Sequence, residues 1–315
     1  MTTEKIIQVA VGLIIDAQKN ILTALRPQHV HQGGLWEFPG GKIHKDETPK
    51  QALARELLEE LGIQLRSADY FMTLPYTYSD LKVVLKIYKV TAYEGEAYGR
   101  EGQTLAWCRL EELDPRYFPA ANRSIITALK LPPYYVITPE PPRTHWQPFI
   151  DQFHRWINQG YRLIQLRALH LSTKEYRALA NELLAIAIDH QALLLANSDV
   201  EWAQSNPAAG LHLNDTLLNH FTVRPIAEAQ WLSAACHSLS ELQQAEALAV
   251  DFVSLSPVQY TQTHPQITPL GWQAWQTLLD QTHLPVYALG GMTRTDLAKV
   301  QSMGAVGIAG IRTFC

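Results

Sequence analysis

The sequence is poor in cysteine. Its 315 residues include three, Cys108, Cys236 and Cys315, which lie far apart and in no paired spacing. An odd, scattered set of cysteines argues against a disulfide framework and against a thiolate zinc site. Cysteine usage of this kind fits a reducing compartment, so we expect a cytoplasmic protein.

The sequence also lacks an excess of positive charge and a long apolar run. Lysine and arginine together number 26 against 30 aspartates and glutamates, so no basic field is available to attract a nucleic acid polymer. The apolar stretch at residues 6–15 is shorter than the roughly 20 residues that span a bilayer, and no small-residue cleavage site follows it. We therefore expect neither secretion nor binding to membranes or nucleic acid polymers.

Apolar residues make up 47% of the chain, enough to bury a large core, and the length favours two domains. The first 131 residues predict a mixed α+β domain with strands at 6–15, 21–25 and 83–90 around one strong helix at 49–61. Two consecutive prolines at 132–133 cannot continue a helix or a central strand. We therefore expect one domain over residues 1–131 and a second over residues 134–315.

The second domain shows short apolar runs that alternate with helical stretches. The eight runs are residues 134–138, 163–166, 193–196, 211–213, 231–235, 252–255, 286–289 and 306–309. Repeated strand–helix units predict parallel strands, and eight is the number that closes a TIM (β/α)8 barrel. The sequence ends six residues after the last run, so we expect the barrel to lack a full last helix.

The helix predicted at residues 49–61 has clear start and stop signals. Thr48 can cap it, Pro49 suits the first turn, Gln51 can complete a capping box, and Gly62 supplies the stop. At roughly 100° per residue, the side chains divide into an apolar face and an acidic face. The apolar face is Ala54, Leu57, Leu58 and Leu61, and the acidic face is Glu56, Glu59 and Glu60.

Crowded carboxylates are unfavourable on an isolated helix. Like charges three or four residues apart repel, and anions in the last turns oppose the helix dipole. A hard divalent cation reverses this balance, because carboxylate oxygens suit Mg²⁺ or Mn²⁺, which proteins commonly share with substrate phosphates. A solvated acidic face is the alternative interpretation and the usual one for a glutamate-rich helix.

The wider spacing favours the metal site. Gly41, Glu47 and residues 55–63 match the pattern G-x5-E-x7-R-E-U-x-E-E-x-G-U, where U is a bulky apolar residue, at every specified position. This pattern is the Nudix box, so the sequence resembles the Nudix hydrolases. A glycine loop lets the backbone approach a metal or phosphate oxygen closely. Arg55, one turn before Glu59, is placed to pair with it.

Nearly all of residues 5–130 resemble one Nudix subgroup, the MutT-type 8-oxo-dGTP diphosphatases. The shared stretches are AVG at 10–12, EFPGGKI at 37–43, ETP at 47–49, YEGE at 93–96, EGQ at 101–103 and FPAAN at 118–122. The resemblance implies an α/β/α sandwich with a mixed sheet. It also implies substitution at a phosphorus of a nucleoside triphosphate, with release of the monophosphate and pyrophosphate.

The same resemblance implies a catalytic and metal-binding set. Its members are the carbonyl of Gly40 and the side chains of Arg55, Glu56, Glu59, Glu60 and Glu101. The expected ion is Mg²⁺, with Mn²⁺ as a substitute, because Mg²⁺ can neutralise phosphate charge and lower the pKa of a bound water. Glu56 is our choice for the base that acts on the attacking water.

The resemblance further implies a substrate-binding set, which is Arg26, His31, Glu37, Phe38, Pro39, Gly40 and Asn122. A carboxamide such as that of Asn122 can both donate to and accept from a purine edge. Without the resemblance, this asparagine would more often cap a helix, and the others would be ordinary loop or core residues. Leu25 and Leu81 replace arginines of the subgroup, which affects selectivity for oxidised guanine more than hydrolysis.

Residues 134–313 resemble the thiamine phosphate synthase and TenI family of barrels. The shared stretches are YVIT at 135–138, QLR at 165–167, GLHL at 210–213, HSL at 237–239, SPV at 256–258 and LGGM at 289–292. Barrels of this class commonly bind phosphate after strands seven and eight. The expected phosphate-binding set is Gln165, Arg167, Gly290, Gly291 and Gly310, although glycine also simply ends strands.

Several groups that the synthases use are replaced. Ser198 stands in the place of a metal-binding aspartate, and Asp215 lies two residues before the position of the second acid. The family's Thr-x-Thr-Lys becomes TQTH at 261–264, and the lysine expected in the loop after the second strand is Leu169. Pro257 occupies the position of the tautomerase's catalytic histidine. We therefore expect a catalytically degenerate barrel.

The leading hypothesis is a Mg²⁺-dependent pyrophosphohydrolase that converts 8-oxo-dGTP to 8-oxo-dGMP. It would sanitise the nucleotide pool and so support DNA replication and repair. Two alternatives stay open. The Nudix half could hydrolyse damaged thiamine or pyrimidine diphosphates, or the barrel could bind a phosphorylated thiamine-related ligand and regulate the hydrolase. In the barrel, His237 is either a remnant ligand-binding residue or a strand-end histidine satisfied by its neighbours.

Overall fold

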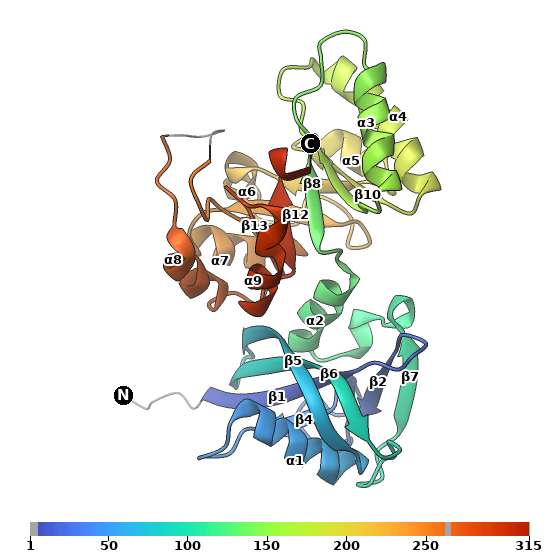
Figure 1. Ribbon diagram of the computed structural model, residues 1–315, viewed down its shortest axis with the longest axis vertical. Helices are drawn as coiled ribbons and strands as arrows, with labels where there is room; N and C mark the ends of the chain where they lie inside the picture. Colours follow the sequence, from blue (N-terminus) through green and yellow to red (C-terminus); the bar gives the residue numbers. More distant parts are fainter. Residues whose placement is uncertain (1–5, 262–265, 315) are drawn as a thin grey trace. The chain divides into compact units, whose positions relative to one another are not determined.

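The computed structural model describes residues 6–261 and 266–314. The chain folds into two compact units, the first built mainly from residues up to Lys130 and the second mainly from Leu131 onward. Each unit has its own sheets (Figure 1). Among the described residues, no helix is long and apolar enough to cross a membrane.

The first unit contains two sheets. Its strands are β1 (Ile6–Ile14), β2 (Asn20–Leu25), β3 (Trp36–Glu37), β4 (Gly40–Lys42), β5 (Gln64–Thr77), β6 (Lys82–Glu94) and β7 (Leu105–Arg109). The larger sheet has the order β4-β1-β6-β5, in which β1 runs parallel to β6 and antiparallel to β4. The smaller sheet has the order β3-β2-β7 and is antiparallel. The larger sheet is therefore mixed, as expected.

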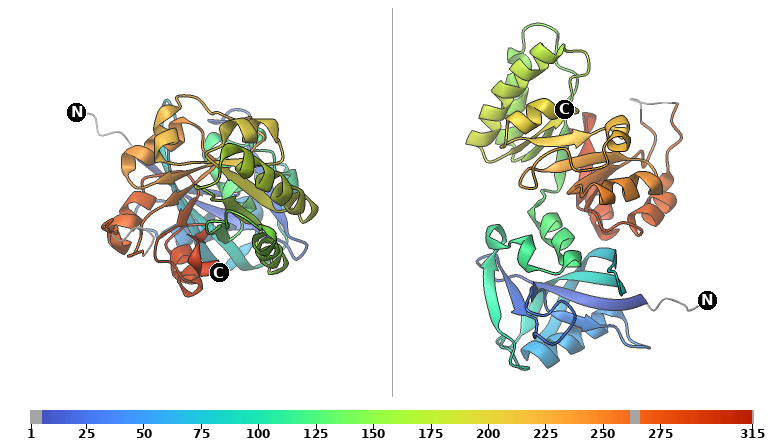
Figure 2. Two further views of the ribbon diagram at one scale, coloured as in Figure 1. Left: turned by 90° about the horizontal axis from the view of Figure 1, so that it is seen from above. Right: turned by 180° about the vertical axis from the view of Figure 1, so that it is seen from behind.

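Helices lie on both sides of these sheets. They are α1 (Pro49–Leu61) and α2 (Ala120–Lys130), the latter preceded by the single 3-10 turns η1 (Leu110–Glu112) and η2 (Pro115–Tyr117). In both side views α1 lies on one side of the strands and α2 on the other (Figures 1 and 2). The α/β/α sandwich expected from the sequence is confirmed.

The longest strand, β5, was not anticipated from the sequence. It pairs with β6 over most of its 14 residues, but the register shifts between Leu65 and Met72. Each shift moves later side chains to the other face, so the apolar residues do not alternate regularly. Pro75 also argues against a strand, yet β5 lies at the edge of its sheet, where proline is tolerated.

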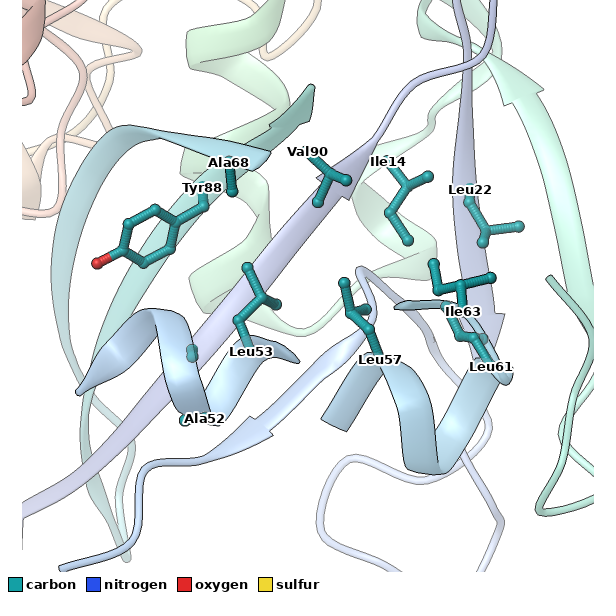
Figure 3. Packing of buried hydrophobic residues seen from close by; sticks show 11 residues of the cluster. Ile14, Leu22, Ala52, Leu53, Leu57, Leu61, Ile63, Ala68, Tyr88 and Val90 are labelled. Atoms are coloured by element: carbon teal, nitrogen blue, oxygen red, sulfur yellow. The ribbon is translucent and has the colours of Figure 1, made fainter. Parts of the chain in front are cut away.

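The core of the first unit is built around α1. Leu53, Leu57 and Leu61 are fully buried and belong to one cluster with Ile14 of β1 and Leu22 of β2. Figure 3 shows the three leucines on the same side of the helix, directed at the strands. Because they are spaced four residues apart, they form one stripe along the helix.

The expected apolar face of α1 was partly wrong. Leu58 is 42% exposed and Ala54 is only half-buried, whereas Ala52 and Leu53 are buried. The stripe is centred on Leu57, and Leu58 is turned away from it by roughly 100°. The rotation of α1 therefore follows the three leucines that meet the sheets.

The second unit is a closed barrel of eight parallel strands. They are β8 (Tyr134–Ile137), β9 (Leu163–Leu166), β10 (Leu193–Asn197), β11 (Gly210–Leu213), β12 (Leu232–Cys236), β13 (Phe252–Leu255), β14 (Val286–Ala288) and β15 (Gly307–Gly310). The strands pair in sequence order, and β15 pairs with β8 to close the barrel. This confirms the expected TIM barrel, with each strand within two residues of the predicted run.

Helices surround the barrel strands (Figure 2). They are α3 (Gln147–Asn158), α4 (Thr173–Asp189), α5 (Val200–Ser205), α6 (Asp215–His220), α7 (Leu239–Ala247), α8 (Gly271–Leu279) and α9 (Leu297–Ser302), with the 3-10 turn η3 (Arg294–Asp296) before α9. The last strand is followed by a single 3-10 turn, η4 (Arg312–Phe314), rather than a full helix in the described residues.

We expect Leu57→Ala to destabilise the first unit by about 2–5 kcal/mol, because it leaves a cavity in a fully buried cluster. Leu58→Ala, at the neighbouring exposed position, is the matched control and should change stability by less than about 0.5 kcal/mol. Scanning calorimetry of the full chain measures both, and equal losses in the two variants would contradict this assignment of the buried face.

Candidate active site

The glutamates of α1 lie against the two glycines that begin β4. A Cβ on Gly41 would lie 2.1 Å from Cδ of Glu56, and one on Gly40 would lie 2.1 Å from the carbonyl oxygen of Ala10. Gly40 also has a φ of +147°, and its backbone N–H donates to Glu60. Only glycine allows these close approaches. Gly41 lets Glu56 of α1 reach β4, and Gly40 lets β4 lie close to β1.

Arg55 connects the carboxylates to one another. Its Nη1 donates to Glu56 Oε1 at 2.8 Å and to Glu59 Oε2 at 3.1 Å, and its Nη2 donates to Glu47 Oε1 at 2.8 Å and to the carbonyl of Lys42 at 3.0 Å. The expected pair with Glu59 is therefore present. Hydrogen bonds from Arg55 and from the backbone N–H of His44 lower the pKa of Glu47 to about 2, so Glu47 is ionised and anchors the guanidinium.

Four carboxylates share the region around Glu60. Burial, as the largest cause, and the negative charges of Glu37, Glu56 and Glu101 together raise the pKa of Glu60 from 4.5 to about 8. Glu37 lies on β3, two of the others lie on α1, and Glu101 is an exposed residue before β7. Glu59 differs, because its side chain is 55% exposed and contacts Arg55.

A divalent cation fits this set of donors. The groups are hard oxygens, and a buried carboxylate beside three others is electrostatically unfavourable until a cation offsets the charge. In residues 6–261 and 266–314, no group of three or more His, Cys, Asp or Glu side chains is arranged to hold a metal ion as it stands. When bound, the ion would supply charge neutralisation at the phosphates.

Three of the expected substrate-binding residues lie together beside β2 and β3. Arg26 forms an ion pair with Glu37, and its Nη2 donates to the backbone carbonyl of His31 at 2.8 Å. Burial raises the pKa of Glu37 above its ordinary value, and Arg26 opposes this shift. The negative charge of Glu37 also raises the pKa of Glu60. The ion pair between Arg26 and Glu37 therefore connects this group to the carboxylates of α1.

Two more residues of the expected substrate-binding set are Phe38, between β3 and β4, and Asn122, in α2. The buried ring of Phe38 lies 5.6 Å from that of Phe118, in the segment that leads into α2. Asn122 is the third residue of α2, so the helix-cap interpretation is wrong. The residue is 8% exposed, and its carboxamide is not among the buried side-chain groups that lack a hydrogen-bond partner in the described residues. Pro39 is buried, and its carbonyl accepts from the N–H of Gly12 at 2.8 Å.

Tyr78 belongs to the same group but was not anticipated. Its ring meets that of His31 edge-on at 5.1 Å, and its hydroxyl accepts a hydrogen bond from the backbone N–H of Ala121 at 3.3 Å. It follows β5, far from both partners in the sequence, and it belongs to no motif. No local signal could therefore have identified it.

A cavity of about 760 Å³ opens at the carboxyl ends of the barrel strands. All five residues of the expected phosphate-binding set line it. Gly290 and Gly291 have φ values of +97° and +70°. A Cβ on Gly290 would lie 2.7 Å from the side chain of Pro257, and one on Gly291 would lie 2.7 Å from the carbonyl oxygen of Tyr260. Close packing of the loops after β13 and β14 thus requires these two glycines independently of any ligand.

Of the two acids near the synthases' metal-binding positions, Asp199 is paired within the protein and Asp215 lines the cavity. Asp199 accepts from Arg177 at 2.8 and 2.9 Å and also caps α5 through the N–H of Trp202. Ser198 is at a φ of +67°, and its buried Oγ meets no hydrogen-bond partner in the part of the chain that the structure describes. Asp215 lines the cavity. Residues 262–264 lie outside the described residues.

Two polar residues of the cavity wall are held by their neighbours. Gln165 accepts from the hydroxyl of Tyr135 at 2.5 Å and donates to Asn197 at 2.7 Å. Nδ1 of His237 lies 2.7 Å from the carbonyl of Ser256, so His237 both lines the cavity and has a protein partner. Leu169, in place of the family's lysine, is 62% exposed at the same cavity.

Comparisons with known proteins agree with this division. Residues 10–128 match the NUDIX domain family, and residues 134–314 match the thiamine monophosphate synthase family. The chain therefore belongs to the Nudix family through its first part and to the thiamine monophosphate synthase family through its second. The first part is a Nudix pyrophosphohydrolase, and Nudix hydrolases generally need a divalent metal.

Individual relatives refine this result. Over 126 residues the chain is 40% identical to the 8-oxo-dGTP diphosphatase of Escherichia coli, which covers 40% of this chain and 98% of that protein. It is 42% identical over 108 residues to the CTP pyrophosphohydrolase of the same organism, covering 34% of this chain and 79% of that protein. Over 186 residues it is 32% identical to "Putative thiamine-phosphate synthase 2" of Aquifex aeolicus, covering 59% of this chain and 99% of that protein.

We expect Glu60→Gln to raise the melting temperature of the metal-free protein at alkaline pH. The folded-state pKa of Glu60 is raised, so its contribution to stability is present below its ordinary value of 4.5 and is lost as the pH rises towards about 8. Glutamine does not ionise and escapes this loss. Thermal melting is measured in EDTA from about pH 5 to about pH 9. The difference in melting temperature between Glu60→Gln and the wild type should widen as the pH rises.

Magnesium should reverse the order, because it stabilises the wild type and not Glu60→Gln. Glu59→Gln, at the 55% exposed position, is the control and should show no such widening. Identical melting curves for wild type and Glu60→Gln at the alkaline end would contradict the raised pKa.

Proposed function

We propose that the first domain, residues 1–131, is a Mg²⁺-dependent 8-oxo-dGTP diphosphatase. It converts 8-oxo-dGTP and water to 8-oxo-dGMP and pyrophosphate, and Mn²⁺ can replace Mg²⁺. The observation that supports the substrate is the placement of Asn122, which is 8% exposed in the first turn of α2, next to Ala121, whose N–H donates to Tyr78 beside His31. Its carboxamide can both donate to and accept from an oxidised purine edge. Removal of oxidised nucleotides from the pool protects DNA replication, and the absence of a cysteine framework favours the cytoplasm as the site of action.

Different residues of the first domain serve as the base, bind the metal ion and orient the nucleoside. Glu56 Oε1 is held by Arg55 at 2.8 Å, while its Oε2 makes no hydrogen bond among the described residues, so Oε2 is available to take a proton from the attacking water. The carbonyl of Gly40 and the carboxylates around Glu60 would hold the ion, which would lower the pKa of a bound water and neutralise phosphate charge. Arg26 and Glu37 orient the nucleoside relative to these carboxylates.

Steady-state pyrophosphate release with Mg²⁺ tests the metal site. We expect Glu60→Gln to lose hydrolysis of every substrate, because it removes a carboxylate of the proposed metal-binding set. The test panel is 8-oxo-dGTP, dGTP, CTP and a thiamine diphosphate. Retention of wild-type rates in Glu60→Gln would contradict the assignment of α1 as the metal-binding helix.

The same assay tests the base-binding residue. We expect Asn122→Ala to lower the ratio of kcat/KM for 8-oxo-dGTP over dGTP by roughly 10- to 100-fold, because the lost partner leaves the purine edge unpaired. Asn158→Ala, at an exposed carboxamide of α3, is the matched control and should leave the ratio unchanged. A wild type that hydrolyses CTP or a thiamine-type diphosphate faster than 8-oxo-dGTP would replace this proposal with the pyrimidine or thiamine alternative.

We further propose that the second domain, residues 134–315, has no thiamine phosphate synthase activity and binds a phosphorylated, thiamine-related ligand without turnover. Asp199 is engaged by Arg177, and Ser198 and Leu169 lack the charges of the groups they replace. We expect no thiamine phosphate from an aminopyrimidine diphosphate and a thiazole phosphate with Mg²⁺, as followed by chromatography. Formation of the product in the wild type, and its loss in Arg167→Gln, would show that the barrel is catalytic.

A further inference from the structure

The loop after β9 directs three donors at one carboxylate. Glu140, in the loop after β8, accepts from Nη1 of Arg167 at 2.7 Å and from the backbone N–H of Leu169 at 3.0 Å. Nδ1 of His170 lies 2.6 Å from the same carboxylate. A guanidinium, a backbone N–H and an imidazole around one carboxylate have the composition of an anion-binding site. In this protein a residue of the same chain fills it.

The two loops that form this contact are tied together at their base. The backbone N–H of Arg167 donates to Oγ1 of Thr138 at 2.9 Å, and the N–H of Thr138 donates to the carbonyl of Gln165 at 3.0 Å. Glu140 follows Thr138 by two residues. The side chains are also partly shielded from water, with exposed fractions of 33% for Glu140 and 24% for Arg167. The ion pair is therefore screened less than one at an open surface.

This contact bears on the barrel cavity because Arg167 lines the cavity and Glu140 does not. A ligand in the cavity would meet the guanidinium of Arg167. That guanidinium is already paired with the carboxylate of Glu140, which does not line the cavity. A second anion can use Arg167 fully only by competing with that carboxylate. The neighbouring Leu169 lines the cavity as well and adds no charge.

We propose that Glu140 is an internal competitor for phosphate-bearing ligands of the barrel cavity. The carboxylate holds Arg167 in an intramolecular pair, and a ligand that carries a phosphate must draw the guanidinium away from Glu140 in order to bind it. The affinity of the cavity for phosphate esters is therefore set by a residue that does not touch the ligand. This inference concerns the second unit and does not depend on the reaction of the first.

Calorimetric titration of the full chain with inorganic pyrophosphate tests the proposal. EDTA is present throughout, so that metal-dependent binding at the α1 carboxylates does not contribute. We expect Glu140→Gln to bind pyrophosphate roughly 10- to 100-fold more tightly than the wild type, the range expected for one charge-assisted hydrogen bond. The double variant Glu140→Gln/Arg167→Gln should lose this gain. Glu182→Gln removes an exposed carboxylate of α4 and is the control for the change in net charge.

Three results would overturn the proposal. They are equal or weaker binding by Glu140→Gln, a gain that persists in the double variant, and an equal gain in Glu182→Gln. Absence of binding in every variant would overturn it as well. Thermal melting checks that each variant is folded. If Glu140→Gln is not, Glu140→Asp takes its place, because the shorter side chain weakens the contact with Arg167 and should give a smaller gain.

Discussion

The burial of one leucine stripe determines the geometry of the candidate active site. Leu53, Leu57 and Leu61 set the rotation of α1 against the strands, and this rotation brings Glu56 and Glu60 to the edge of the same contact. The hydrophobic effect supplies the free energy for a placement that charge alone opposes, since carboxylates repel one another and lose hydration on burial. The apolar face of α1 therefore also supports its acidic face.

Charge is balanced differently on the two sides of α1. At the side of Glu47 and Glu59, the guanidinium of Arg55 offsets the carboxylates within the protein. At Glu60 the neighbouring groups are acidic, and its pKa is raised. The first arrangement holds the carboxylates in position. The second leaves an excess of negative charge that a divalent cation can offset. One motif thus contains both the support and the site.

The barrel illustrates that a fold can persist while its site changes. Eight buried parallel strands close the barrel, and apolar packing is sufficient for this. The positions of the charged groups near the cavity depend instead on individual ion pairs. Asp199 is paired with Arg177, and Arg167 is paired with Glu140. Membership of the thiamine monophosphate synthase family therefore establishes the architecture of this domain, whereas its chemistry depends on these particular pairs.

The sequence by itself determined whatever depends on local interactions. The bounds of α1 follow from the cap at Thr48 and the stop at Gly62, the eight barrel strands follow from short apolar runs, and the box spacing predicts that the carboxylates of α1 bind a metal ion. Only the tertiary structure decided the shifted register of β5, the exposure of Leu58, the place of Tyr78 beside His31, and the pairing of Arg167 with a carboxylate from another loop. Each of these depends on contacts between segments distant in the chain, and neither side-chain periodicity nor helix capping carries information about them.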